Sequence, residues 1–268
     1  MSDFDKLGIV IRYEFLKHVR RARLYIILAI TLFAEALVLV LVAVLSHHGF
    51  PADVKAMAAL LTIGPSLAAI GAVFFAGDAI AGEYEAKTGF LLFINPIKKE
   101  TLWIGKYLAG FLSLTLLMIF TYIIIAVALL AIYQTVPWQM YESFGIALYY
   151  AAAVLSTTFL FSALSRGSMG ATIMTLLFVW VICGILESVL AYTGNPYWFV
   201  LSSGGDAIAN VYGGMDMYLS SLGMNSSQLG SMMNFQLVTP AMASWGMTIY
   251  FVGGLVSSIF LARRRQLA

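Results

Sequence analysis

Three acidic residues lie inside long apolar stretches of the sequence, where a charged side chain is costly. They are Glu35, Asp78 and Glu187. A carboxylate in the hydrocarbon layer of a membrane has to be protonated, paired or hydrated. Each of the three is therefore a candidate for handling a proton or a substrate on a pathway through the membrane.

Each acid also has a structural interpretation. Glu35 could form a hydrogen bond to a Ser or Thr of a neighbouring helix. Asp78 could face lipid headgroups or cap a short helix, and Glu187 could lie at the membrane interface. The three acids are expected at different depths, so no pair suited to general acid–base catalysis is evident.

Methionines gather in the segment 193–240 and offer a second kind of chemistry. They are Met215, Met217, Met224, Met232 and Met233. Thioethers are soft ligands for Cu(I), and Met215 and Met217 would be the first candidates. Met is also an adaptable packing residue, and no His or Cys lies nearby in the sequence. We predict no metal site, and expect short helices that cover the outer face and contact a second copy.

The composition indicates that lipid is the simplest solvent for this chain. Of the 268 residues, 61% are hydrophobic and only 10% are charged, whereas soluble domains are about a quarter charged. A single cysteine, Cys183, excludes an intrachain disulfide. Six runs reach the roughly 20 residues that a helix needs to cross a bilayer. They are approximately 24–45, 56–81, 107–133, 144–164, 169–192 and 241–262.

Basic residues orient the six predicted spans, because cytoplasmic loops are rich in Lys and Arg. Segments 1–23, 82–106 and 263–268, with the turn at Arg166, contain 14 of the 15 Lys and Arg residues. Only Lys55 falls on the other side, and the long loop 193–240 has none. We therefore predict that both termini are cytoplasmic.

The segment 1–23 has apolar residues at helical spacing. They are Phe4, Leu7, Ile11, Phe15 and Val19, with charged residues between them. This pattern is typical of an amphipathic helix in the plane of the headgroups. Such a helix could anchor the chain or move with the helix bundle, and the sequence leaves both roles open.

The segment 82–106 is a charged island between the second and third spans. Residues 86–94 could form a short helix that carries Phe90, and Asn95-Pro96 would end it. A short helix with exposed aromatic and charged side chains could dock into a groove of a soluble partner. It could also lie at the interface with no partner, its lysines reaching the headgroups.

The island resembles the first cytoplasmic loop of ABC type-2 permeases, the membrane subunits of ABC transporters, including the branch associated with multicopper-enzyme maturation. The resemblance lies in an acidic pair, a Gly/Thr turn, a Pro-Ile step with basic residues, and a Gly-Lys pair before the third span. The matching residues are Glu83, Glu85, Lys87, Thr88, Gly89, Pro96, Ile97, Gly105 and Lys106. Thr88-Gly89 reverses the Gly-Thr order that is common in the family.

The resemblance implies that the island binds a separate ATP-binding subunit and transmits its movement to the bundle. The contact residues would be Glu83, Glu85, Lys87, Thr88, Gly89, Phe90, Pro96, Lys98 and Lys99, with Arg166 as a second contact or as a simple topological charge.

This chain has no nucleotide-binding motif of its own. Its Gly105-Lys106 pair lacks the first Gly of a phosphate loop and is followed by Tyr107. Residues 201–206, LSSGGD, are similar to the signature of ABC ATPases but contain an extra Ser and accompany no Walker motif. We expect no cofactor or catalytic residue here, and ATP and Mg²⁺ in the partner.

The sequence thus predicts an all-α integral membrane protein with an N-terminal interfacial helix, six spans, a cytoplasmic coupling helix and a long outer loop. We expect a plasma-membrane permease of an ABC exporter that works with an ATP-binding subunit, a second permease copy and lipid, without nucleic acid. The alternatives are an intramembrane enzyme that uses Glu35, Asp78 or Glu187, and a membrane scaffold.

Overall fold

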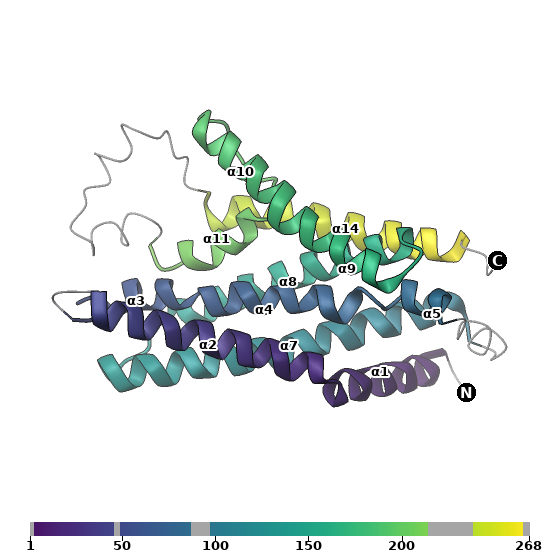
Figure 1. The fold of residues 1–268 in the computed structure, drawn as a ribbon, viewed down its shortest axis with the longest axis horizontal. Helices are drawn as coiled ribbons and strands as arrows, with labels where there is room; N and C mark the ends of the chain where they lie inside the picture. The colour runs from purple at the N-terminus through teal and green to yellow at the C-terminus, as the bar shows by residue number, and fades with distance from the viewer. Residues whose placement is uncertain (1–2, 46–48, 87–96, 214–237, 265–268) are drawn as a thin grey trace.

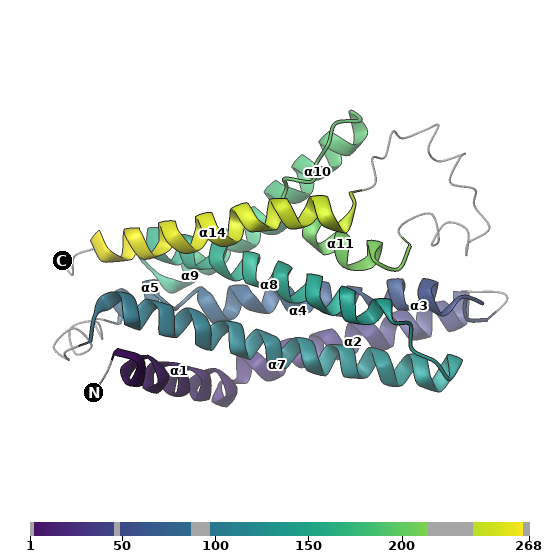
Figure 2. The same ribbon diagram turned by 180° about the vertical axis from the view of Figure 1, so that it is seen from behind.

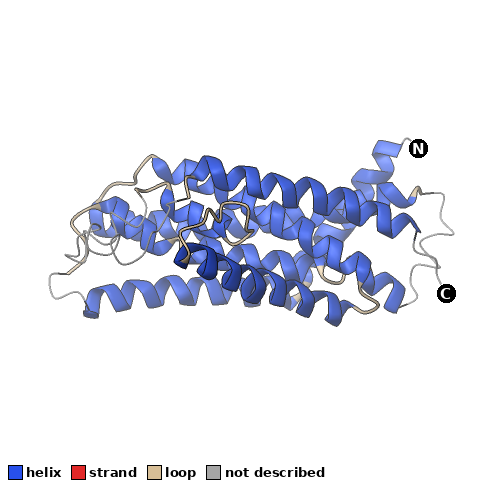
Figure 3. Cartoon of the chain, turned by 90° about the horizontal axis from the view of Figure 1, so that it is seen from above, coloured by secondary structure: helices blue, strands red, loops and turns tan. Residues whose placement is uncertain are grey.

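The structure, a computed structural model, describes residues 3–45, 49–86, 97–213 and 238–264. Within these residues it is a bundle of helices without strands (Figure 3). Six helical stretches are long and apolar enough to cross a membrane, which confirms the predicted fold class. They lie roughly side by side along the long axis of the molecule (Figure 1).

The first part of the chain forms α1 (Asp3–Arg20), α2 (Ala22–Leu45), and a second span in three pieces. The pieces are α3 (Val54–Leu61), α4 (Ile63–Ala76) and α5 (Ala81–Glu85). The predicted run 56–81 is therefore helical but interrupted twice. One break is at Thr62, just before Gly64-Pro65. The other is the turn between α4 and α5.

The turn between α4 and α5 is stabilised from another helix. Ser162 Oγ accepts hydrogen bonds from the backbone N–H groups of Ile80 (3.1 Å) and Ala81 (3.0 Å) and donates one to the carbonyl of Gly77 (2.9 Å). The N–H groups at the start of a helix have no acceptor within the helix, and this buried hydroxyl oxygen accepts from two of them.

The third and fourth spans are α7 (Lys99–Tyr133) and α8 (Gln139–Leu164). The third span begins at Lys99 rather than at Tyr107 as predicted. Its first two turns are polar enough to resemble a loop in sequence, yet Leu102 and Trp103 are buried and hold them in the helix. In α8 an unbroken run from Tyr150 to Phe159 is buried, so this helix is the centre of the bundle.

The fifth span consists of α9 (Ser168–Leu176), the π-helical segment η1 (Leu177–Ile182) and α10 (Cys183–Tyr192). The short helix α11 (Ser203–Asn210) follows, and α14 (Pro240–Arg264) is the sixth span. Figure 2 shows α14 lying along α8, whereas α10 diverges from the bundle. The predicted short helix at residues 86–94 falls almost entirely outside the described residues.

Both ends of the chain lie at the same end of the bundle as α5 and the start of α7 (Figures 1 and 2). The start of α3 and the helix α11 lie at the opposite end. The end that carries the termini is called the polar end below.

Candidate functional site

A buried lysine joins three elements at the polar end. Lys106 of α7 has only 3% of its side chain exposed, and its Nζ lies 2.5 Å from Glu83 Oε1 on α5 and 3.2 Å from Glu14 Oε1 on α1. A buried charge is tolerated only when it is paired and hydrogen-bonded. The cluster Glu14–Glu83–Lys106 therefore couples the positions of α1, α5 and α7.

The neighbouring glycine explains how α1 comes close enough to reach this lysine. A Cβ at Gly105 would lie 2.6 Å from Val10 Cγ1 and 3.0 Å from Val10 Cβ, so α1 packs closely over this turn of α7. The Gly-Lys pair in the second turn of α7 thus has a physical role: the glycine lets α1 come close, and the lysine pairs with Glu14 on the buried face of α1.

The second ionic contact ties the junction of α1 and α2 to the second span. Asp78 Oδ2 accepts hydrogen bonds from Arg21 Nη1 (2.6 Å) and Arg23 Nη1 (3.0 Å). Arg23 also donates to the carbonyl of Phe74 (3.3 Å). Asp78 is thereby engaged in ion pairs with two arginines, a contact that the sequence did not indicate.

Glu85 connects α5 to the start of the fifth span. Its Oε2 accepts hydrogen bonds from the backbone N–H (2.8 Å) and the hydroxyl (2.7 Å) of Ser168. Ser168 is the first residue of α9, where backbone N–H groups are free and the helix dipole favours an anion. The island and the turn that contains Arg166, predicted as two separate contacts, are therefore joined.

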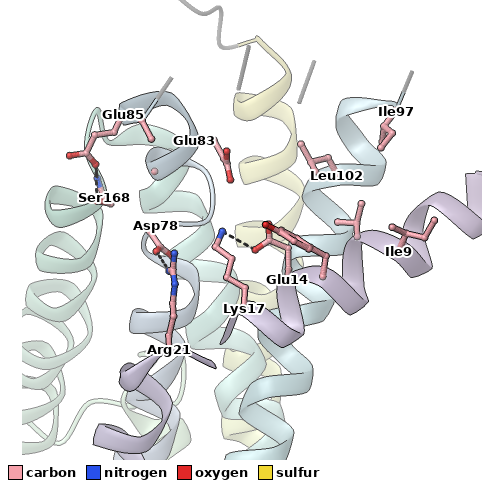
Figure 4. Close-up of a pocket in the computed structure, with 14 residues that line it drawn as sticks. Ile9, Glu14, Lys17, Arg21, Asp78, Glu83, Glu85, Ile97, Leu102 and Ser168 are labelled. Carbon is pink, nitrogen blue, oxygen red and sulfur yellow. Dashed lines mark hydrogen bonds and ion pairs between the residues drawn. The ribbon is translucent and has the colours of Figure 1, made fainter. Parts of the chain in front are cut away.

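These groups surround a cavity of about 680 Å³ between α1, α5, α7 and α9. Figure 4 shows four acidic residues around the cavity, namely Glu14, Asp78, Glu83 and Glu85. It also shows two basic residues, Lys17 in α1 and Arg21 directly after α1. Lys17 Nζ lies 3.2 Å from Glu14 Oε2. The wall also has apolar residues, namely Ile9, Val10, Ile97 and Leu102.

Two further ion pairs lie on the surface beside the cavity. Lys98 Nζ is 2.8 Å from Asp3 Oδ2, and this pairing raises the pKa of Lys98 and lowers that of Asp3. Arg263, in the last turn of α14, pairs with Glu100 at the start of α7. Exposed pairs of this kind contribute little to stability.

The predicted contact residues are only partly described. Glu83 is buried within the cluster, whereas Glu85, Lys98 and Arg166 are exposed and Lys99 is partly exposed. Lys87, Thr88, Gly89, Phe90 and Pro96 lie outside the described residues, as do Met215 and Met217. Within the described ranges, no group of three metal-binding His, Cys, Asp or Glu residues is present.

The three predicted pathway acids do not meet. Asp78 is held at the polar end, and Glu35 lies within α2, buried without a hydrogen-bond partner among the described residues. Glu187 on α10 forms a hydrogen bond with Asp206 on α11.

Glu14 is the important residue that the sequence prediction missed. The signal was present in the helical spacing of Val10, Glu14 and His18, which share the face of α1 that is buried in the structure. The apolar residues named for this helix drew attention to a neighbouring face. An acid on the inner face of an amphipathic helix indicates a buried basic partner, which here is Lys106.

The comparisons with known proteins agree with this architecture. A search of curated proteins returned no match. Residues 10–183 match the sequence model of the ABC-2 family transporter proteins. The match begins in α1 and ends at the start of α10, so it includes the cavity and the cluster around Lys106. The chain belongs to the ABC-2 family of transporter proteins.

Proposed function

We propose that this chain is the permease subunit of an ABC exporter in the plasma membrane, and that a separate ATP-binding subunit docks at the polar end. Membership of the family supports a membrane component of transport, and permeases of this family generally pair with such a subunit. ATP and Mg²⁺ would be held by that subunit, and a second permease copy would complete the pathway.

The observation that carries the proposal is the buried cluster of Glu14, Glu83 and Lys106. It joins α5 to both α1 and α7, and two of its members, Glu83 and Lys106, stand at the two ends of the charged island. A displacement imposed on the island by a docked partner would therefore reach two other helices without a flexible link. Nucleotide can drive transport only if its binding favours one arrangement of these helices over another.

The exposed residues near the cavity supply the proposed contact. Glu85, Lys98, Lys99 and Arg166 belong to the island or to the adjoining turn, together with the residues 87–96 between them. Glu83 is buried, so in this proposal it does not contact the ATP-binding subunit but transmits the movement of α5 to Lys106 on α7. This division separates substitutions that weaken docking from substitutions that weaken the fold.

The test is co-purification of the tagged chain from native membranes, followed by an ATPase assay and identification of the bound subunit. The double variant Lys98→Glu with Arg166→Glu changes two exposed charges at the polar end and should reduce the recovered ATPase. Lys55→Glu reverses one basic charge at the opposite end and should leave recovery unchanged. Equal ATPase recovery with all three chains would contradict docking at this site.

A further inference from the structure

Glu35 is the most buried acidic residue that the proposed docking does not use. It lies in α2 with 1% of its surface exposed, and neither carboxylate oxygen has a hydrogen-bond partner among the described residues. The buried hydroxyl of Thr31, one turn earlier, donates instead to the carbonyl of Leu28 (2.9 Å). The expected hydrogen bond from Glu35 to a Ser or Thr is therefore missing within the described part of the chain.

The carboxyl group lies against the break between α3 and α4. A Cβ at Gly64 would be 2.7 Å from Glu35 Cδ and 2.8 Å from Glu35 Cγ, so the glycine makes room for this side chain. At the break, both the backbone N–H and the hydroxyl of Thr62 donate to the carbonyl of Ala59. Pro65 has no N–H to offer to the preceding turn.

Glu35 also has no counter-ion among the residues that the structure describes. The elements packed against α2 are α1, α3, α4 and α7. Among their described residues no charged or titratable side chain acts on the carboxyl group. Glu14 of α1 and Lys106 of α7 are paired with each other at the polar end. An ionised carboxylate here would be buried and unpaired, which is strongly unfavourable, so the packed arrangement holds the neutral acid.

Interrupted membrane helices commonly form ion and proton sites, because the break exposes backbone polar groups and provides a place where helices can separate. We propose that Glu35 is a proton-binding site inside the membrane, which holds a proton while α2 packs against the α3–α4 break and releases it when these helices separate and water enters. The proton then favours the packed arrangement, since it binds that arrangement better. This inference does not depend on the ATP-binding subunit.

The test uses dicyclohexylcarbodiimide, an apolar reagent that adds to a protonated carboxylic acid without loss of any group. The tagged full-length chain is treated in its native membranes at mildly acidic and at alkaline pH, then purified for peptide mass spectrometry. We expect an adduct on Glu35 at acidic pH that decreases several-fold at alkaline pH. Asp78, which is held as a carboxylate by two arginines, should carry little adduct at either pH.

The variant Glu35→Gln keeps the size of the side chain and should lose this adduct alone. An unmodified Glu35 peptide from chains that carry the adduct on other carboxyl groups would overturn the proposal, because the reagent would then have been present and active. An equal amount of adduct at both pH values would also overturn it, because the proton would not be released.

Discussion

Lys106 joins three helices at the polar end through its ion pairs with Glu14 and Glu83. In Lys106→Met, Glu14 and Glu83 would lose the buried ammonium that lies between them, while Glu14 would keep its ion pair with Lys17. Removing one partner of a buried ion pair costs about 3 to 5 kcal/mol. We expect a markedly lower unfolding temperature of the purified chain, measured by intrinsic fluorescence in detergent.

The matched control for Lys106→Met also neutralises the two acids that contact Lys106, namely Glu14 and Glu83. Adding Glu14→Gln and Glu83→Gln should restore most of the lost stability, because the two carboxylates that contacted Lys106 are then neutral. If Lys106→Met unfolded at the temperature of the unaltered chain, the cluster would have no structural role.

Gly64 and Glu35 should show strong coupling, because the three atoms nearest to a Cβ at position 64 all belong to Glu35. Gly64→Ala alone should destabilise the chain by about 1 to 3 kcal/mol through overpacking. In the Glu35→Ala background the same change should cost much less, since the colliding atoms are gone. A double-mutant cycle measured by denaturant unfolding gives this difference. Equal costs in both backgrounds would mean that the two residues do not touch.

At the scale of elements, the docking of α1 should depend on pH through His18. This side chain is buried on α1, with its ring 5.3 Å from that of Phe75 on α4, and burial lowers its pKa to about 4. Its ordinary pKa is about 6.5. The unfolded or undocked state binds the proton more readily, so stability is complete above about pH 6.5 and decreases as the pH falls towards 4.

The expected loss at pH 5 is about 2 kcal/mol relative to neutral pH. His18→Leu should reduce this pH dependence. In the unaltered chain, the backbone amides of α1 should be the first to lose protection from hydrogen exchange when the pH is lowered. A chain whose α1 exchanges equally at pH 7 and pH 5 would contradict this role of His18.

The sequence predicted the helices better than their interruptions. Hydropathy located all six spans, because an unbroken apolar run is a strong signal. The same run conceals the breaks at Thr62 and after Ala76, where only Gly64-Pro65 and Gly77-Asp78 hint at them. The π-helical segment η1 has no signal that we can identify in residues 177–182.

The contacts of the site could not be read from sequence, because they join distant residues. Asp78 is 57 residues from Arg21 and Glu85 is 83 from Ser168. The acidic and basic types were recognised, and the Gly-Lys pair was noted through its resemblance to the family. That Glu83 faces inward and Glu85 outward follows only from the path of α5.

At the scale of the whole molecule, the two ends of the bundle differ in kind. The polar end combines the ion pairs, the cavity and both termini, whereas the opposite end has α3, α11 and the pair of Glu187 and Asp206. This separation is what a permease requires if one end meets an ATP-binding subunit and the other meets the outside. The proposed function therefore requires that the polar end of the bundle faces the cytoplasm.

The orientation can be tested with two matched alanines, both exposed, at opposite ends of the bundle. Ala52 precedes α3 and Ala86 follows α5. In a Cys183→Ser background, a membrane-impermeant maleimide should label Ala52→Cys in intact cells and should label Ala86→Cys only after permeabilisation. The native Cys183 is buried, so the unaltered chain should stay unlabelled in both conditions. Labelling of Ala86→Cys from outside would place the island away from cytoplasmic ATP. Docking of an ATP-binding subunit there would then be impossible, even though the fold and its ion pairs would be unaffected.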